Sequence, residues 1–151
     1  MIKYWQDNSA RMMQLTIEHA RMVLIALFIA FLVAIVLIAV FLRKKNWMNS
    51  LIYFFSLLYS VPSYAFFALL IPITGLGETT AIIVLAFYNE YVLLRTFITG
   101  IREVDPNYIE VARGMGMTQE EIFTKVQLPL SMPAIFSGLQ VALASTMAIA
   151  T

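Results

Sequence analysis

The feature that most constrains the fold of this chain is a set of long stretches with few or no charged side chains. Such stretches cover residues 22–42, 51–71 and 134–151, and residues 80–98 form a fourth that is interrupted by Asn89, Glu90 and Arg95. A helix needs about 20 apolar residues to cross a hydrocarbon core of roughly 30 Å. The stretches lack the alternating apolar and polar residues of transmembrane barrel strands. The other structure that can span a lipid bilayer with its backbone hydrogen bonds satisfied is the helix. We therefore expect an all-α, multi-pass membrane protein with four visible spans.

The composition supports this prediction and excludes several functions. Only 13% of the 151 residues are charged, against about 25% in an ordinary soluble domain. The net charge of +1 gives no reason to expect a nucleic-acid partner. The chain has no cysteine and a single histidine, His19, which excludes thiol catalysis, a His-based triad and a zinc site built from His or Cys. No P-loop string is present, so we expect no cofactor here and assign ATP and Mg²⁺ to a partner.

The distribution of Lys and Arg predicts the orientation. One side of the membrane holds Lys3, Arg11 and Arg21; the other holds the following residues, with Arg95 near the same end: Arg43, Lys44, Lys45, Arg102, Arg113 and Lys125. The positive-inside rule then places loops 43–50 and 99–133 in the cytoplasm and the N-terminus outside. We interpret residues 1–21, which include Tyr4 and Trp5, as an interfacial amphipathic segment. Because the last apolar run ends at Thr151 without a polar flank, we expect a further helix beyond it.

The longest predicted cytoplasmic loop has strong helix signals. Asp105-Pro106 is an N-cap followed by a first-turn proline. Thr118 to Glu121 is a capping box that starts a second helix. Between them, Gly114 and Gly116 allow the positive φ that ends a helix, and Pro129 is expected to close the second helix. The result is a helical hairpin too small to bury its own apolar face, so it must contact the membrane helices, a partner, or both.

The same loop carries a family motif. Glu110-Val111-Ala112 is followed after three residues by Gly116, after nine more by Val126, and then by Leu128-Pro129. This spacing resembles the EAA loop of binding-protein-dependent ABC importer permeases, with Val111 and Val126 as conservative departures. The resemblance implies the type I importer transmembrane domain over residues 19–151. It also implies that Glu110, Ala112, Arg113 and Gly116 contact a separate ATPase subunit, with Leu128 and Pro129 completing the coupling loop.

Further motifs resemble one subgroup of these permeases, the importers of glycine betaine, carnitine and choline. They are Ser60-Val61-Pro62-Ser63, Gly75-Leu76-Gly77, Arg95 through Gly100-Ile101, and Gly114 to Thr118. The resemblance implies a plasma-membrane subunit that works with a second, identical or different membrane subunit, two ATPase subunits and an extracytoplasmic binding protein. The alternatives are a permease for methionine or another amino acid and, from a different class, a small ion-coupled cation carrier that uses Glu90. Without a hydrolase or metalloprotease motif, we do not expect an enzyme.

Several residues within the spans are candidates for function or for packing. Glu90 lies in mid-span, where an ionisable group is costly; it either faces a solute pathway or pairs with a neighbouring helix. Tyr59 and Tyr64 either line the pathway, since aromatic rings bind quaternary ammonium groups, or serve as packing and interfacial aromatics. Gly138 and Ala142, four residues apart, form a small-residue face for helix packing or for a dimer seam.

Overall fold

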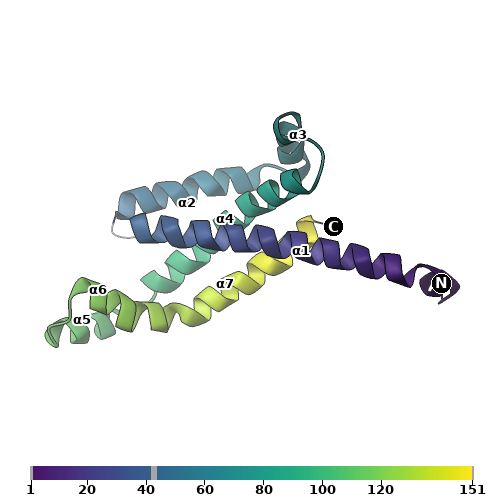
Figure 1. Cartoon of the computed structure of the whole chain (residues 1–151). Coiled ribbons are helices and arrows are strands. Elements are labelled where there is room, and N and C mark those ends of the chain that lie inside the picture. Colours follow the sequence, from purple (N-terminus) through teal and green to yellow (C-terminus); the bar gives the residue numbers. More distant parts are fainter. Residues whose placement is uncertain (1, 42–43, 151) are drawn as a thin grey trace.

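The computed structural model describes the backbone of residues 2–41 and 44–150, and the side chains of residues 8–41, 44 and 46–150. Within these residues the chain is helical and no strand is present (Figure 1). The elements are α1 (Ile2–Phe41), α2 (Lys45–Ser60), α3 (Ser63–Thr74), α4 (Glu78–Arg102), α5 (Pro106–Gly114), α6 (Gln119–Ile122), the π-helical turn η1 (Phe123–Gln127) and α7 (Leu128–Ile149). The predicted all-α class is confirmed. Outside the described residues lie Arg43, Thr151 and the side chains of Lys3, Tyr4, Trp5 and Lys45.

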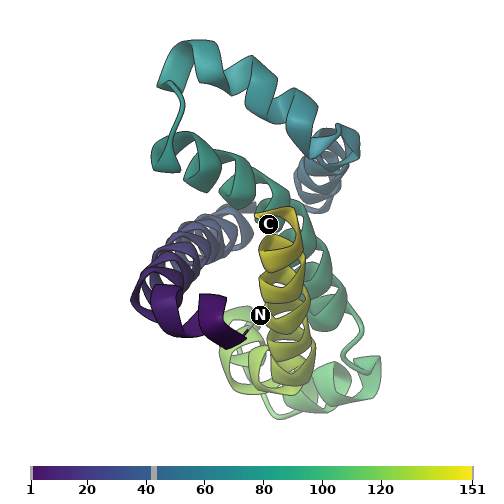
Figure 2. The same cartoon turned by 90° about the vertical axis from the view of Figure 1, so that its right-hand side faces the viewer.

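Helix α4 is the centre of the bundle. It contacts α1, α2, α3 and α7, and Figure 2 shows α1, α2 and α7 gathered along it. Its most deeply buried apolar side chains, each at most 2% exposed, are Val84, Leu85, Leu93, Leu94, Phe97 and Ile98. Among the described residues α4 supplies more buried apolar side chains than any other helix, and its neighbouring helices hold these side chains in place.

Small residues bring α1 close to the rest of the bundle. Ala26, Ala30 and Ala34 recur every four residues along α1, and each is at most 1% exposed. Residues spaced by four lie on one face of a helix, and small side chains allow the close backbone approach on which helix packing in lipid depends. The opposite face of α1 carries exposed apolar side chains such as Phe28 and Val36. Helix α1 is therefore packed on one face only.

Three helical runs are long and apolar enough to cross a membrane: Asn8–Phe41, Glu78–Arg102 and Gln119–Ile149. The last run has 31 residues, which is about 46 Å at 1.5 Å per residue and exceeds the roughly 30 Å of a hydrocarbon core. Its charged first turns therefore lie beyond the apolar layer. Helix α1 has no break at residue 21, so the segment expected to be interfacial continues the first span as one helix.

The stretch 51–71, expected as a single span, is divided in the structure. Helices α2 and α3 meet at an angle of 95°, and they qualify as a fourth span only when counted together. The break falls at Val61-Pro62, whose backbone is extended. Proline has no N–H and pushes the preceding residue out of the helical region. The carbonyl of Val61 accepts a hydrogen bond from the Tyr88 hydroxyl of α4, which holds the bend against the bundle.

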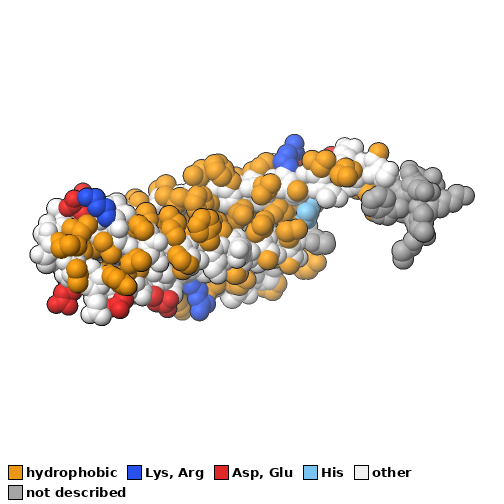
Figure 3. Space-filling view, turned by 90° about the horizontal axis from the view of Figure 1, so that it is seen from below, with side chains coloured by type: hydrophobic (Ala, Val, Ile, Leu, Met, Phe, Trp, Pro, Cys, Tyr) orange, Lys and Arg blue, Asp and Glu red, His pale blue; other side chains and the backbone are white. Residues whose placement is uncertain are grey.

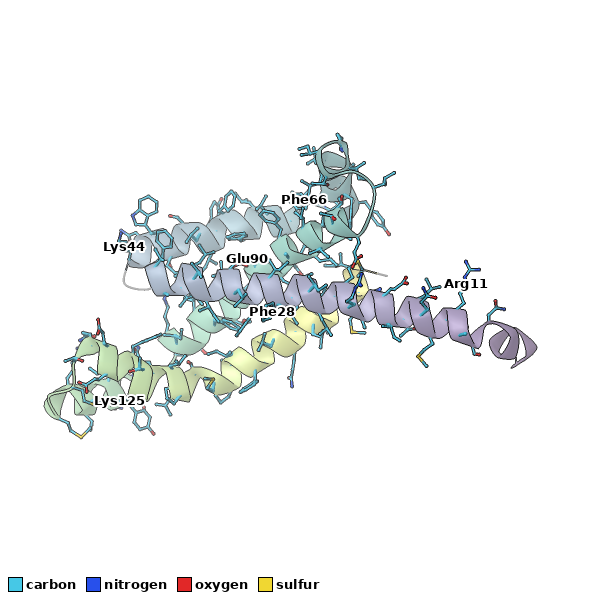
Figure 4. The ribbon with its side chains drawn as sticks, viewed as in Figure 1. Arg11, Phe28, Lys44, Phe66, Glu90 and Lys125 are labelled. Carbon is cyan, nitrogen blue, oxygen red and sulfur yellow. The ribbon has the colours of Figure 1, made fainter. Side chains whose placement is uncertain are left out.

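Charged side chains are distributed unevenly along the bundle. The C-terminal end of α1, the start of α2 and the α5–α6 segment lie at one end (Figure 1). Figure 4 places Lys44 and Lys125 at this end, Glu90 midway along the bundle and Arg11 at the opposite end. On the face seen in Figure 3, charged side chains gather toward the α5–α6 end and hydrophobic side chains cover the middle. The loops predicted to share one side of the membrane therefore lie at the same end of the structure.

Candidate functional site

Residues 105–127 form a compact unit, the α5–η1 hairpin, that joins α4 to α7. Helix α5 starts as the sequence predicts, because the Asp105 carboxylate accepts a hydrogen bond of 2.9 Å from the backbone N–H of Asn107. Pro106 occupies the first turn, where a missing N–H costs nothing. The predicted N-cap is thus confirmed, and it fixes the residue at which the chain leaves α4 and enters the hairpin.

Helix α5 ends in a Schellman motif that depends on Gly116. The N–H of Met117 donates to the carbonyl of Ala112 at 3.1 Å, and the N–H of Gly116 donates to the carbonyl of Arg113 at 2.9 Å. These are the two bonds of that motif, and its C′ residue adopts the left-handed conformation. Gly116 has φ of +80°, as predicted, whereas Gly114 is the last helical residue of α5. The turn of the hairpin is therefore fixed by backbone geometry at Gly116.

The second arm begins with the predicted capping box, which is confirmed. The Glu121 carboxylate accepts hydrogen bonds from the backbone N–H of Thr118 at 3.0 Å and from its hydroxyl at 3.1 Å, and the Thr118 hydroxyl accepts from the Glu121 N–H. Lys125 lies one turn later and bonds Glu121 at 2.8 Å. The Lys125 bond first, then the Thr118 bonds, lower the pKa of the Glu121 carboxyl to about 2. Glu121 therefore stays ionised and ties the start of α6 to η1.

The prediction that Pro129 closes this helix is wrong. The helix continues through η1 into α7 and reaches Ile149. An α-helical proline would clash with the carbonyl four residues earlier. Here the wider π turn precedes Pro129, with the Leu128 N–H bonding the Phe123 carbonyl five residues back, and Pro129 falls in the first turn of α7. Leu128 and Pro129 thus mark the junction between the hairpin and the last membrane helix.

One exposed face of α5 is apolar. Tyr108, Val111 and Met115 are 57%, 61% and 69% exposed, and their spacing of three and four residues places them on one helix face. We call these three residues the α5 stripe. Ala112, expected to contact an ATPase, is instead the buried residue of α5, on a helix that contacts α6 and η1. The other predicted contact residues, Glu110, Arg113 and Gly116, are exposed.

Glu90 is enclosed in the bundle. Its side chain is 3% exposed, and it lines an otherwise apolar cavity of about 200 Å³ between α4, α1 and α2. Its Oε1 atom has no hydrogen-bond partner among the described residues, so the interhelical partner expected from sequence is missing at that atom. The adjacent Asn89 does bridge two helices, because its Oδ1 accepts from the Thr146 hydroxyl of α7 at 2.7 Å.

The two tyrosines predicted to line a pathway lie in different surroundings. Tyr64 is 88% exposed on α3. Tyr59 of α2 packs on Tyr91 of α4 with ring centroids 4.9 Å apart and on Tyr88 at 5.6 Å. The Tyr91 hydroxyl in turn accepts a 2.6 Å hydrogen bond from Arg95. The structure thus brings Tyr59 to a polar face of α4 and leaves Tyr64 and Glu90 apart from it.

A groove of about 410 Å³ continues from Tyr91 along α2 and α4; we call it the α2–α4 groove. Its lining residues are Asn49, Ile52, Tyr53, Ser56, Tyr91, Arg95, Ile98, Thr99 and Arg102. Sequence reasoning did not predict that these residues form a groove, although residues 95–101 carry one of the family motifs. The available signal was the spacing of Tyr91, Arg95 and Arg102, which repeats at four and seven residues and marks one face of a membrane helix.

Gly138 and Ala142 pack inside the chain. Both are buried on α7, and a Cβ built on Gly138 would lie 2.2 Å from the Thr96 Oγ1 and 3.3 Å from a Phe97 ring carbon, both on α4. The small-residue face predicted from sequence therefore contacts α4 of the same chain. This close crossing sets the spacing between the helices on either side of the α5–η1 hairpin.

Comparison with known proteins places this geometry in a family. Residues 23–151 match the family described as "Binding-protein-dependent transport system inner membrane component". The choline transport system permease protein OpuBB of Bacillus subtilis is 36% identical over 140 residues, which are 93% of this chain. The glycine betaine/carnitine/choline permease OpuCB of the same organism is 34% identical over 140 residues. The carnitine transport permease OpuCB of Listeria monocytogenes is 33% identical over 151 residues, or 100% of this chain. The alignments cover 64% of the length of the two Bacillus proteins and 69% of the Listeria protein.

Proposed function

The chain belongs to the family of inner membrane components of binding-protein-dependent transport systems, and from this premise we propose that it is the permease subunit of an ATP-driven importer of quaternary-amine osmoprotectants. The relatives named for choline, glycine betaine and carnitine support this solute class. ATP hydrolysis belongs, in this proposal, to two partner ATPase subunits. A second membrane subunit and an extracytoplasmic binding protein complete the transporter, and the N-terminus lies outside the cell.

The observation that carries the proposal is the continuity of the α5–η1 hairpin with two membrane helices. Three residues connect α4 to α5, and η1 passes into α7 without a break. Helices α4 and α7 also pack on each other. A push on the hairpin therefore acts on both helices, and an ATPase that binds nucleotide would use it to bias an inward/outward equilibrium. The α5 stripe offers an apolar contact for such a partner.

The alternatives from the sequence have weaker support. An ion-coupled carrier would use Glu90, but this side chain is buried beside an otherwise apolar cavity and does not line the α2–α4 groove. Such a carrier would also have no use for the α5–η1 hairpin. The named relatives are permeases for choline, carnitine or glycine betaine, which disfavours methionine or another amino acid.

Uptake measurements in right-side-out vesicles test the proposal. The vesicles contain the complete transporter, and labelled glycine betaine, carnitine and choline are offered outside with the binding protein. We expect uptake when ATP is enclosed and the proton gradient is collapsed, because in this proposal ATP binding and hydrolysis by the partner ATPases supply the driving force. Uptake that disappears with the gradient and ignores ATP would support the ion-coupled carrier instead.

The Val111→Asp substitution tests the role of the hairpin. An acidic group in the centre of the α5 stripe places a charge in an apolar contact, and we expect the amount of ATPase that co-purifies to fall by about tenfold or more. Gln119→Glu is the matched control, because it adds the same charge in the first turn of α6, where the helix dipole favours an acidic group. Equal ATPase recovery in both variants would contradict docking at the stripe.

A further inference from the structure

The α2–α4 groove combines two cationic groups with tyrosine rings and hydroxyls. Arg95 and Arg102 lie seven residues apart on α4, and Tyr53, Ser56 and Asn49 face them from α2. From Tyr91 to Arg102 the lining extends over 12 residues, which is about 16 Å along the helix. Its volume of about 410 Å³ lies within the range of about 300–1,000 Å³ typical of small-molecule sites. The groove ends at the side of the bundle that carries the α5–η1 hairpin.

Arg95 carries a charge that the described part of the chain does not neutralise. Its hydrogen bond goes to the neutral hydroxyl of Tyr91, and its guanidinium lies 5.8 Å from the centre of that ring. No described carboxylate is within ion-pair distance of it; Glu103, just beyond the end of α4, lines a second cavity together with Arg95 without forming an ion pair. A guanidinium in a membrane-spanning helix is costly unless it faces water or an anion. The contact with Tyr91 uses the Nη1 group and one face of the Arg95 guanidinium, so the other N–H groups of Arg95 remain to bind an anionic oxygen.

A ring for a cation is available in the same groove. Tyr53 is 66% exposed, and it makes no aromatic stacking contact among the described residues. Tyr91, by contrast, is occupied by Tyr59 and Arg95. An exposed tyrosine face attracts an ammonium group that is weakly hydrated. Separate places for an anionic and a cationic group therefore line one cavity, which is the chemistry of a zwitterion.

We infer that the α2–α4 groove is the part of the solute pathway nearest the α5–η1 hairpin and that Arg95 binds the carboxylate of a zwitterionic quaternary amine there. The ammonium end of the solute faces Tyr53, and Tyr91 positions the guanidinium through its hydroxyl. This inference rests on the proposed function and adds a specificity: carnitine and glycine betaine carry a carboxylate, and choline does not. Arg95 therefore favours the first two solutes over choline in the membrane subunit itself.

The test compares solutes with and without a carboxylate. Uptake of carnitine and choline is measured in ATP-loaded vesicles with the complete transporter carrying Arg95→Gln, and the amount of assembled complex is measured alongside. We expect carnitine uptake to fall by about tenfold or more, since a charge-assisted pair is lost, and choline uptake to change by less than about twofold. Arg95→Lys keeps the charge and should retain part of the carnitine uptake. Arg21→Gln is the matched control, because Arg21 pairs with Glu78 away from the groove and its loss should leave the ratio unchanged.

Tyr91→Phe separates positioning from folding. It keeps the ring that packs on Tyr59 and removes the hydroxyl that holds Arg95, so we expect an intermediate loss of carnitine uptake at normal abundance. Equal loss of both solutes in Arg95→Gln and Arg95→Lys, or no loss of carnitine uptake, would overturn the inference. A wild-type complex that carries choline but not carnitine would also overturn it and leave the proposed function standing. A wild-type complex that carries no quaternary amine would refute the proposed function itself.

Discussion

Replacing Gly138 by alanine probes the crossing of α7 over α4. The added Cβ would lie 2.2 Å from the Thr96 Oγ1, 2.9 Å from the Thr96 Cβ and 3.3 Å from the Phe97 Cε1. Rotation of the Thr96 side chain moves its hydroxyl but not its Cβ, and it breaks the 2.7 Å hydrogen bond to the Val92 carbonyl. Overpacking costs about 1–3 kcal/mol and the lost hydrogen bond about 1 kcal/mol. Alanine returns about 1 kcal/mol as a better helix former, so the net loss of stability is about 1–3 kcal/mol.

Equilibrium unfolding in detergent, followed by circular dichroism, measures this loss. Gly114→Ala is the matched control, because Gly114 is helical and a Cβ there has no neighbour within 4 Å; it should leave stability equal or raised. In the Gly138→Ala background, Thr96→Ala removes the nearest atom and should recover part of the loss. A Gly138→Ala protein as stable as Gly114→Ala, or a double variant with no recovery, would refute the packing that we describe.

Two further predictions concern the α5–η1 hairpin. Gly116→Val forces a side chain into the left-handed region at a cost of about 1–2 kcal/mol, so uptake should fall while the protein stays at normal abundance. Gly114→Val is the control, because the backbone at Gly114 is helical, and it should affect uptake less. Equal uptake by the two variants would contradict the role of the turn. The pKa of Glu121, lowered from 4.5 to about 2, means that its contribution to stability is full above pH 4.5 and is lost as the pH falls toward 2. The protection factor of the Thr118 amide, which is the intrinsic exchange rate divided by the observed rate, should therefore fall over this range and should stay constant in Glu121→Gln. A protection factor that still falls with pH in that variant would count against the capping box.

The sequence was most informative where local rules decide the structure. The N-cap at Asp105, the capping box at Thr118 and the left-handed Gly116 depend on side chains and backbone within a few residues, and all three are confirmed. The prediction that the helix ends at Pro129 came from the same kind of rule and was wrong. A π turn precedes this proline, and no residue type or spacing in the sequence marks a π turn.

The candidate sites depended more on tertiary structure. The sequence indicated that an ionisable group at Glu90 is costly within a membrane span, but it did not indicate that Glu90 would line a different cavity from the groove. The family motif predicted that Ala112 contacts a partner, but the motif could not show that Ala112 is buried, because its burial depends on how α5 packs on α6 and η1. The α2–α4 groove joins residues about 40 positions apart, so only the packing of α2 on α4 places Tyr53 and Arg95 along one surface.

The π turn at Phe123–Gln127 sets the phase between the hairpin and α7. Successive residues of an α-helix are offset by about 100° and 1.5 Å, and a π turn accommodates one more residue than an α turn does. The extra residue is therefore absorbed within one turn, and deleting it should leave an ordinary α turn with the α5 stripe pointing in nearly the same direction, whereas a residue added to an unbroken α-helix would rotate the stripe by about 100° around the α7 axis. The direction in which the stripe points thus depends on the type of helix in one short segment, independently of the residues that form the stripe.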